Sequence, residues 1–158
     1  MTSDKQPFCT TINELISKLE PNQRLMGLDV GEKTIGMALS DVLLSIATPV
    51  DTIRRGKFTK DIQALQKIVK ERNVGGFVIG YPINMNGTEG PRCQSIRQFA
   101  RNIHEKLALP CFLWDERMSS LAVERMMTEG GLSRNRKAEL VDKLAAGYIL
   151  QGAINCRQ

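Results

Sequence analysis

The feature that most constrains the fold is an aspartate inside an apolar stretch near the start of the chain. Asp29 lies in the run Leu25–Val30, and a buried carboxylate is unfavourable unless a cation or another partner accompanies it. A glycine then opens a tight turn, and residues 34–40 alternate apolar with small side chains, which is the two-residue period of a strand. The segment 24–41 therefore predicts a β-hairpin with Asp29 beside its turn. An aspartate that caps a turn or pairs with Lys33 fits these residues equally well, so the rest of the chain must decide.

Downstream of the hairpin, strands alternate with helices. We expect a third strand over Leu43–Val50, at an edge of the sheet because Pro49 has no backbone N–H to donate. Residues 75–80 form a short unbroken apolar run, the pattern of a strand covered on both faces, and residues 110–114 form another apolar strand. Helical spacing of apolar residues predicts four helices: one through Ile62–Val69 that stops near Asn73, one over about 91–107, one from Ser119 or Ser120 to Gly130, and one over about 138–155.

Ahead of the hairpin, Thr11 and Glu14 can form a capping box for a short helix that Pro21 ends. We therefore divide the chain into an N-terminal tail with a short helix, residues 1–21, and one main domain, residues 22–158. Three antiparallel strands followed by two strands that alternate with helices predict an α/β fold with a mixed five-stranded sheet. Helices on both faces of such a sheet give a ribonuclease H-like fold.

Composition narrows the classes of partner and of chemistry. The net charge of +5 favours an anionic partner. The four cysteines are widely separated and His104 is the one histidine, so a zinc ribbon, a thioredoxin-type site and a histidine metal cluster are excluded, and a Ser-His-Asp triad has no promising histidine. A basic run before the first long helix is more typical of solvated surface than of a binding site; it consists of Arg54, Arg55, Lys57 and Lys60.

The N-terminus has no hydrophobic signal-peptide core, and no apolar run approaches the length of a membrane span. The sequence therefore predicts a cytoplasmic protein.

Three carboxylates are expected to converge in this fold. The first strand is central and lies beside the fourth, so Asp29 on the first strand, Glu116 after the fifth strand and Asp142 in the last helix can meet. Asp142 is in line with the small apolar residues that pack on the sheet, at spacings of three, four, seven and eleven. Clustered carboxylates repel one another unless they share divalent cations, and hard oxygen ligands suit Mg²⁺ or Mn²⁺. Phosphodiester hydrolysis is the natural use of such a site.

Four segments of the chain together resemble the YqgF (RuvX) family, over roughly residues 24–154: GLDVGEKTIGMALSD, VIGYPINMNGTEG, WDERMSS and VDKLAAGYIL. The resemblance implies a RuvC-like nuclease of the ribonuclease H type. Such a protein is described either as a Holliday-junction resolvase or as a nuclease that matures the 5′ end of pre-16S ribosomal RNA. By motif position the resemblance implies that Asp29, Glu116 and Asp142 are catalytic metal ligands, with Asp115 as a fourth carboxylate.

One departure from RuvC concerns the end of the fourth strand. The strand ends in Gly80-Tyr81-Pro82 where RuvC has an acidic residue, and the next carboxylate is Glu89, which leaves the ligands of a second metal open. The resemblance and the residues agree on a mechanism in which two metals activate water and stabilise the leaving 3′ oxygen. Basic residues would hold the phosphate backbone. The candidates are Arg134, Arg136 and Lys137 in a loop before the last helix, followed by Arg92, Arg97 and Arg117.

Two other functions fit the same sequence. A non-catalytic nucleic-acid-binding or ribosome-assembly module could use the same fold and the same basic surface. Half of an actin-like or sugar-kinase fold is a second alternative, because Asp29-Val30-Gly31 followed by Thr34 resembles a phosphate loop, although such enzymes need two domains. Within the nuclease interpretation, ribosomal RNA precursors and branched DNA both remain open as substrates, as do the oligomeric state and an association with the ribosome.

Overall fold

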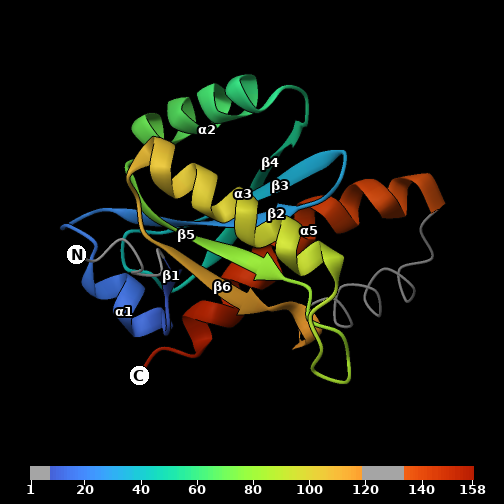
Figure 1. Cartoon of the computed structure of the whole chain (residues 1–158). Coiled ribbons are helices and arrows are strands. Elements are labelled where there is room, and N and C mark those ends of the chain that lie inside the picture. The colour runs from blue at the N-terminus through green and yellow to red at the C-terminus, as the bar shows by residue number, and fades with distance from the viewer. Residues whose placement is uncertain (1–7, 119–133) are drawn as a thin grey trace, which may run out of the picture.

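The computed structural model describes residues 8–118 and 134–158, and the side chains of all of these except residues 118 and 134–143. Figure 1 shows a mixed sheet with helices packed against it, the red C-terminal helix crossing it. In the described part of the chain the sheet has six strands, in the order β1-β6-β5-β2-β3-β4. The strands are β1 (Phe8–Cys9), β2 (Arg24–Val30), β3 (Thr34–Ser40), β4 (Ala47–Arg54), β5 (Val74–Tyr81) and β6 (Cys111–Asp115).

The directions of the strands agree with the sequence-based expectation. β2, β3 and β4 are antiparallel neighbours, whereas β2 with β5, and β5 with β6, are parallel pairs. β2 is central and lies directly beside β5, and β4 lies at an edge, as Pro49 predicted. All eight residues of β5 are buried, which confirms the prediction of a strand covered on both faces. Leaving out β1, this is the predicted five-stranded sheet, and the fold is ribonuclease H-like.

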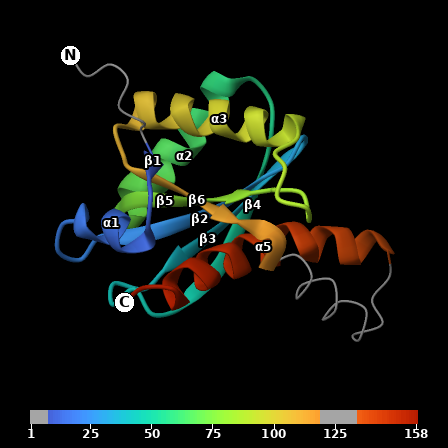
Figure 2. The same cartoon turned by 60° about the horizontal axis from the view of Figure 1, so that its bottom comes forward.

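Helices cover both faces of the sheet. They are α1 (Ile12–Ser17), α2 (Phe58–Arg72), α3 (Pro91–Leu107) and α5 (Arg134–Asn155), with a 3₁₀ turn, η1 (Glu116–Met118), after β6. Figure 2 shows α2 and α3 on one side of the sheet and α5 on the other. Buried residues of α2 and α3 join one core cluster, and those of α1 and α5 join a second on the opposite face. None of the helices in the described ranges is long and apolar enough to cross a membrane.

α5 lies very close to the central strand. A Cβ atom placed on Gly27 of β2 would be 2.7 Å from Leu150 Cβ and 2.8 Å from the Ala146 carbonyl oxygen. Both contacts are shorter than van der Waals distance, so only glycine allows this approach of helix to strand. The close packing brings the helix that contains Asp142 against the strand that contains Asp29.

The third strand starts later than predicted. It begins at Ala47 rather than Leu43, whose side chain is 75% exposed. The reason is a turn organised by Asp41, whose Oδ1 accepts hydrogen bonds from the backbone N–H groups of Ser45 (2.7 Å) and Ile46 (3.0 Å). Four of the five residues 42–46 are apolar, but this turn keeps them out of the sheet.

Two further predictions need correction. The sheet has a sixth strand, because Phe8 and Cys9 pair in parallel with β6. The last helix begins at Arg134, so the predicted loop through Arg134, Arg136 and Lys137 is the first turn of α5 instead. The helix predicted from Ser119 or Ser120 lies outside the described residues.

Candidate functional site

Asp29 lies on β2, a strand with a hydrogen-bonded neighbour on each side. β2 is hydrogen-bonded to β3 on one side and to β5 on the other, and Asp29 is in register with Gly36 of β3. Its side chain is partly buried. The pairing with β3 extends through Asp29 and that with β5 reaches Leu28, so the backbone of Asp29 is held near the carboxyl end of the central strand.

Glu116 reaches the same region from the end of β6. In the parallel pair of β5 and β6, Gly80 is in register with Trp114, and the chain turns into η1 directly after Asp115. A Cβ atom on Gly80 would lie 2.9 Å from both Cδ and Oε1 of Glu116. The missing side chain at Gly80 therefore leaves the space that the Glu116 carboxyl group occupies.

Asp29 and Glu116 interact directly through their side chains. Burial is the main cause that raises the pKa of Glu116 to about 7, and the negative charge of Asp29 and a hydrogen bond with it add to the shift. The positive charge of Arg92 acts in the opposite direction. The two carboxyl groups are thus close enough to share a proton, the behaviour expected of crowded acids without a cation.

This carboxylate pair suits a divalent cation. Two oxygen donors that repel each other form a hard, anionic donor set, which Mg²⁺ and Mn²⁺ prefer. Among the side chains that the structure describes, no group of three His, Cys, Asp or Glu residues is arranged to hold a metal ion. The third predicted residue, Asp142, is in α5, but its side chain lies outside the described part.

Asp115 has a different partner from its neighbour Glu116. Its Oδ2 atom accepts hydrogen bonds from Nη2 (2.6 Å) and Nε (2.9 Å) of Arg117, and its Oδ1 accepts one from the Arg117 backbone N–H (3.0 Å). The Arg117 guanidinium holds the pKa of Asp115 below its usual value. Each side chain of this ion pair is 34% exposed, so the two charges neutralise each other at the surface.

Glu89 does not replace the acidic residue that RuvC has at the end of the fourth strand. Tyr81 is buried in the core cluster under α2 and α3, the face of β5 opposite to the one from which Gly80 faces Glu116 and α5. The Tyr81 hydroxyl donates a hydrogen bond to Glu89 and accepts one from Arg97 Nε at 2.6 Å. The network holds both Glu89 and Arg97 on this face.

Among the predicted phosphate contacts whose side chains the structure describes, Arg92 is one whose charge acts on the carboxylate pair. The side chain is exposed at the N-terminal turn of α3, and Nη2 donates to the Val30 carbonyl oxygen at 3.2 Å. Its charge also acts on Glu116. The other predicted cations lie elsewhere or outside the described side chains: Arg97 and Arg117 are paired as above, and Arg134, Arg136 and Lys137 are in the first turn of α5.

The strand order and the paired carboxylates define a ribonuclease H-like protein of the nuclease type. The chain matches the family RuvX, described as Holliday junction resolvase, over residues 23–156. It belongs to this family of nucleases.

Similar proteins agree with this assignment. A protein of Paramagnetospirillum magneticum named "Putative pre-16S rRNA nuclease" is 55% identical over 144 residues, which cover 91% of this chain and 93% of that protein. A protein of Rhodobacter capsulatus with the same name is 54% identical and covers 94% of this chain and 93% of its own length. Among solved structures, Thermus thermophilus RuvC in complex with a Holliday junction substrate is 12% identical, with a TM-score of 0.49, over 80% of this chain and 91% of that one.

The residue that sequence reasoning missed at this site is Gly80. It was noted only as a departure from RuvC, whereas in the structure its missing side chain makes room for Glu116. A glycine near the end of a fully buried strand was a signal that another group approaches the backbone closely there. The approaching group itself was not identifiable from the sequence, because Glu116 is 36 residues away in the numbering.

Proposed function

We propose that the protein is a metal-dependent endonuclease that hydrolyses phosphodiester bonds in structured nucleic acid. Asp29, Glu116 and Asp142 are the catalytic residues and hold Mg²⁺ or Mn²⁺, with Asp115 as an additional ligand when its ion pair with Arg117 opens. The observation that carries the proposal is the direct contact of the Asp29 and Glu116 carboxyl groups, with the pKa of Glu116 raised to about 7. Two acids this close are stable as a charged pair when a cation lies between them.

The proposed reaction is a hydrolysis at phosphorus. Water attacks the phosphodiester and loses a proton, the bond from phosphorus to the 3′ oxygen breaks, and the leaving 3′ oxygen takes up a proton, which gives a 3′ hydroxyl and a 5′ phosphate. Divalent cations supply water activation and stabilise the charge on the leaving oxygen. The contribution of the chain is placement: β2 and the turn after β6 hold the two acids, and Arg92 presents a positive charge beside them.

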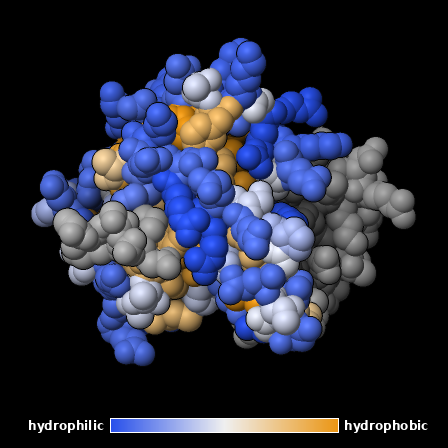
Figure 3. All heavy atoms as spheres, in the orientation of Figure 1, coloured by the Kyte–Doolittle hydropathy of each residue, from blue (hydrophilic) through white to orange (hydrophobic). Residues whose placement is uncertain are grey.

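The proposed substrates are the 5′ end of pre-16S ribosomal RNA, which the names of the relatives favour, and the Holliday junction named for the family. Ribosome biogenesis in the cytoplasm is the setting that goes with the first. Hydrophilic residues predominate on the face shown in Figure 3, which suits contacts with phosphates and sugars better than a hydrophobic docking surface. Arg117, Arg134, Arg136 and Lys137 remain proposed backbone contacts, while Arg97 is committed to the Tyr81 network.

The test is cleavage of both substrates by purified protein. A pre-16S RNA fragment and a four-way DNA junction are each incubated with Mg²⁺ or Mn²⁺, and the ends of the products are mapped. Asp29→Asn should lower the cleavage rate by about 10³-fold or more, because a lost metal ligand removes several kcal/mol of transition-state stabilisation. The matched control is Asp51→Asn, the same change at an exposed aspartate of β4.

The second candidate function is a non-catalytic nucleic-acid-binding module, which the net charge of +5 supports equally. The same assay separates the two. Binding of both probes without metal-dependent cleavage by the wild-type protein would favour the module, and wild-type turnover in Asp29→Asn would contradict the catalytic assignment.

A further inference from the structure

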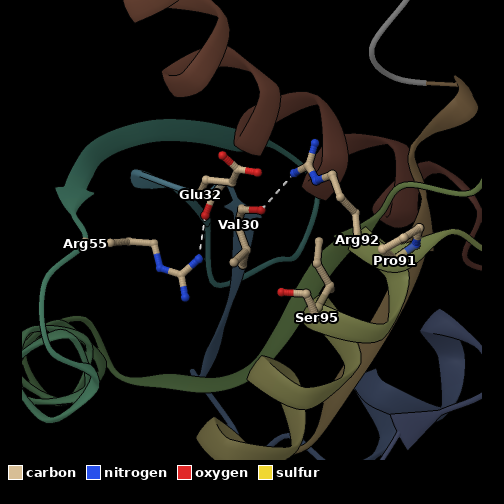
Figure 4. Close-up of a pocket in the computed structure, with 8 residues that line it drawn as sticks. Val30, Glu32, Arg55, Pro91, Arg92 and Ser95 are labelled. Atoms are coloured by element: carbon tan, nitrogen blue, oxygen red, sulfur yellow. Dashed lines mark hydrogen bonds between the residues drawn. The ribbon is translucent and has the colours of Figure 1, made fainter.

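A pocket with basic residues in its lining lies next to the carboxylate pair. The turn after β2, the segment after β4 and the first turns of α3 enclose a pocket of about 220 Å³. We call it the arginine pocket. Figure 4 shows Arg55 and Arg92 on opposite sides of Val30, with Ser95 on the α3 side. The lining residues are Val30, Gly31, Glu32, Arg55, Pro91, Arg92, Ser95 and Ile96.

Arg55 is held firmly in this pocket. Its Nη1 donates to the Gly31 carbonyl oxygen at 2.5 Å, its backbone N–H donates to Lys33 at 2.8 Å, and its guanidinium lies 5.3 Å from the ring centroid of Phe99. The side chain is partly buried, unlike that of Arg54, which is exposed. A guanidinium fixed by one hydrogen-bond acceptor and one ring face is pre-organised, and its remaining N–H groups can bind a ligand at little entropic cost.

Neither arginine forms an ion pair among the described side chains, where the ion pairs are those of Arg97 with Glu89 and of Arg117 with Asp115. Arg55 and Arg92 each donate to a backbone carbonyl, of Gly31 and Val30 respectively, and a neutral acceptor leaves the charge in place. The Arg92 charge also acts on Glu116. The first turn of α3 adds to the positive potential, since it has no acidic residue and its cap at Gly90 makes no side-chain hydrogen bond.

Arg92 links this pocket to the candidate catalytic site. On one side it lines the arginine pocket, and on the other its charge acts on the Glu116 carboxyl group. A ligand bound by both arginines would therefore lie directly beside the group held at Asp29 and Glu116. Successive phosphates of one nucleic-acid strand have this relation to each other.

We propose that the arginine pocket binds a backbone phosphodiester adjacent to the one that is cleaved, with Arg55 and Arg92 as its ligands and Ser95 as an additional hydrogen-bond donor. The inference rests on the proposed function for the identity of the neighbouring phosphate. The proposal gives Arg55 a role in phosphate binding. From the sequence, Arg55 was expected to lie in a basic run on the solvated surface. Glu32 is an exposed residue of the pocket lining, and its negative charge repels the bound phosphate and lowers the affinity of the pocket for it.

The experiment measures equilibrium binding in EDTA, so that cleavage plays no part. Fluorescence anisotropy is followed with a labelled hairpin RNA and a labelled four-way DNA junction over a range of salt concentrations. Arg55→Met should weaken binding of both probes about tenfold and lower the slope of log affinity against log salt by about 0.7 to 0.9, because one phosphate contact is lost. Arg54→Met is the matched control, the same change at the adjacent exposed position, and should change affinity less than about twofold.

Two conservative variants guard against a purely structural effect. Arg55→Lys keeps the charge but loses the planar fork, so its affinity should fall between those of the wild type and Arg55→Met. Glu32→Gln removes the opposing charge and should tighten binding about two- to fivefold. Equal affinities of the Arg55→Met and Arg54→Met proteins, or an unchanged affinity of Glu32→Gln, would overturn the proposal.

A mononucleotide distinguishes the source of the phosphate. If AMP binds in a manner that depends on Arg55 while the RNA and the junction do not, the pocket takes a free phosphate ester and the backbone assignment is wrong. A different result would contradict the proposed function alone. The protein would then cleave neither substrate, but its binding to them would still depend on Arg55. Cleavage by the wild type together with Arg55-independent binding would contradict the pocket alone.

Discussion

Gly80 shows how a single missing side chain shapes the candidate site. The space beyond its Cα is filled by Ile149 of α5 and by the carboxyl group of Glu116. The carboxyl group on this side of β5 therefore belongs to a residue that follows β6 and not to a residue of β5 itself.

Gly80→Ala should destabilise the protein and impair the site together. The new Cβ would lie 2.5 Å from Ile149 Cδ1 and 2.9 Å from the Glu116 carboxyl group, so both groups must move. Overpacking of this kind costs about 1–3 kcal/mol. We expect a lower free energy of unfolding in urea and slower cleavage. Gly56→Ala is the control, because its Cβ would meet no atom within 4 Å, and it should unfold as the wild type does.

The carboxylate pair also predicts a pH dependence of stability. The pKa of Glu116 is raised from 4.5 to about 7, so between these pH values the folded protein binds the proton more tightly than the unfolded chain. Stability from this group is present at low pH and is lost as pH rises through 7. In EDTA, the free energy of unfolding should fall by roughly 1–3 kcal/mol between pH 5 and pH 8.

Glu116→Gln tests this cause directly. The variant cannot ionise at this position, so it should lose that fall in stability and be more stable than the wild type at pH 8 in EDTA. Urea unfolding at the two pH values measures both effects. An unchanged slope in Glu116→Gln would show that other groups are responsible.

At the residue scale, the sequence predicted the positions of the acids better than their partners. Asp29 was identifiable because a carboxylate in an apolar strand is costly, and Glu116 because it follows a strand end. The pairing of Asp115 with Arg117 depends on the geometry of η1, which composition does not reveal. The roles of Asp29, Glu116 and Asp142 in catalysis stay predictions until cleavage is measured.

Among the elements, α3 ends in an unfavourable conformation. Its C-cap, Ala108, has φ of 55°, in the left-handed region where a Cβ atom is strained and glycine is preferred. Ala108→Gly should therefore raise the free energy of unfolding by about 0.5–1 kcal/mol. The same substitution inside a helix, Ala64→Gly in α2, should lower it by a similar amount. Chemical denaturation of both variants checks the prediction, and effects of the same sign would contradict it.

Element boundaries were predicted well where caps and periodicity agree. The helix predicted over 91–107 matches α3, since Pro91 starts it and the apolar spacing continues to Leu107. The start of the third strand was misplaced, because the mostly apolar residues 42–46 resemble a strand until the hydrogen bonds to Asp41 are known. The start of α5 was misplaced because the dense positive charge of residues 134–137 is typical of a solvated loop, although Ser133, directly before Arg134, is a residue type that caps helices.

At the scale of the whole molecule, α1 is part of the core. Leu15 of α1 is fully buried and joins the core cluster that includes Leu25 and Leu150. Leu15→Ala should therefore cost about 2–5 kcal/mol of stability, as expected for a buried leucine. Leu43→Ala, at a side chain that is 75% exposed, should change it by less than about 0.5 kcal/mol. If Leu15→Ala unfolds as the wild type does, α1 is a peripheral attachment.

The position of β2 has a consequence for the newly made chain. Its carboxylate, Asp29, is synthesised early, whereas Glu116 follows β6, the last strand of the sheet along the described chain. β2 can pair with β3 at once, but its parallel neighbour β5 and the outer strand β6 come from later parts of the chain. A polypeptide whose synthesis has not passed β6 therefore has one half of the acidic pair, and the pair forms only after η1 has been translated.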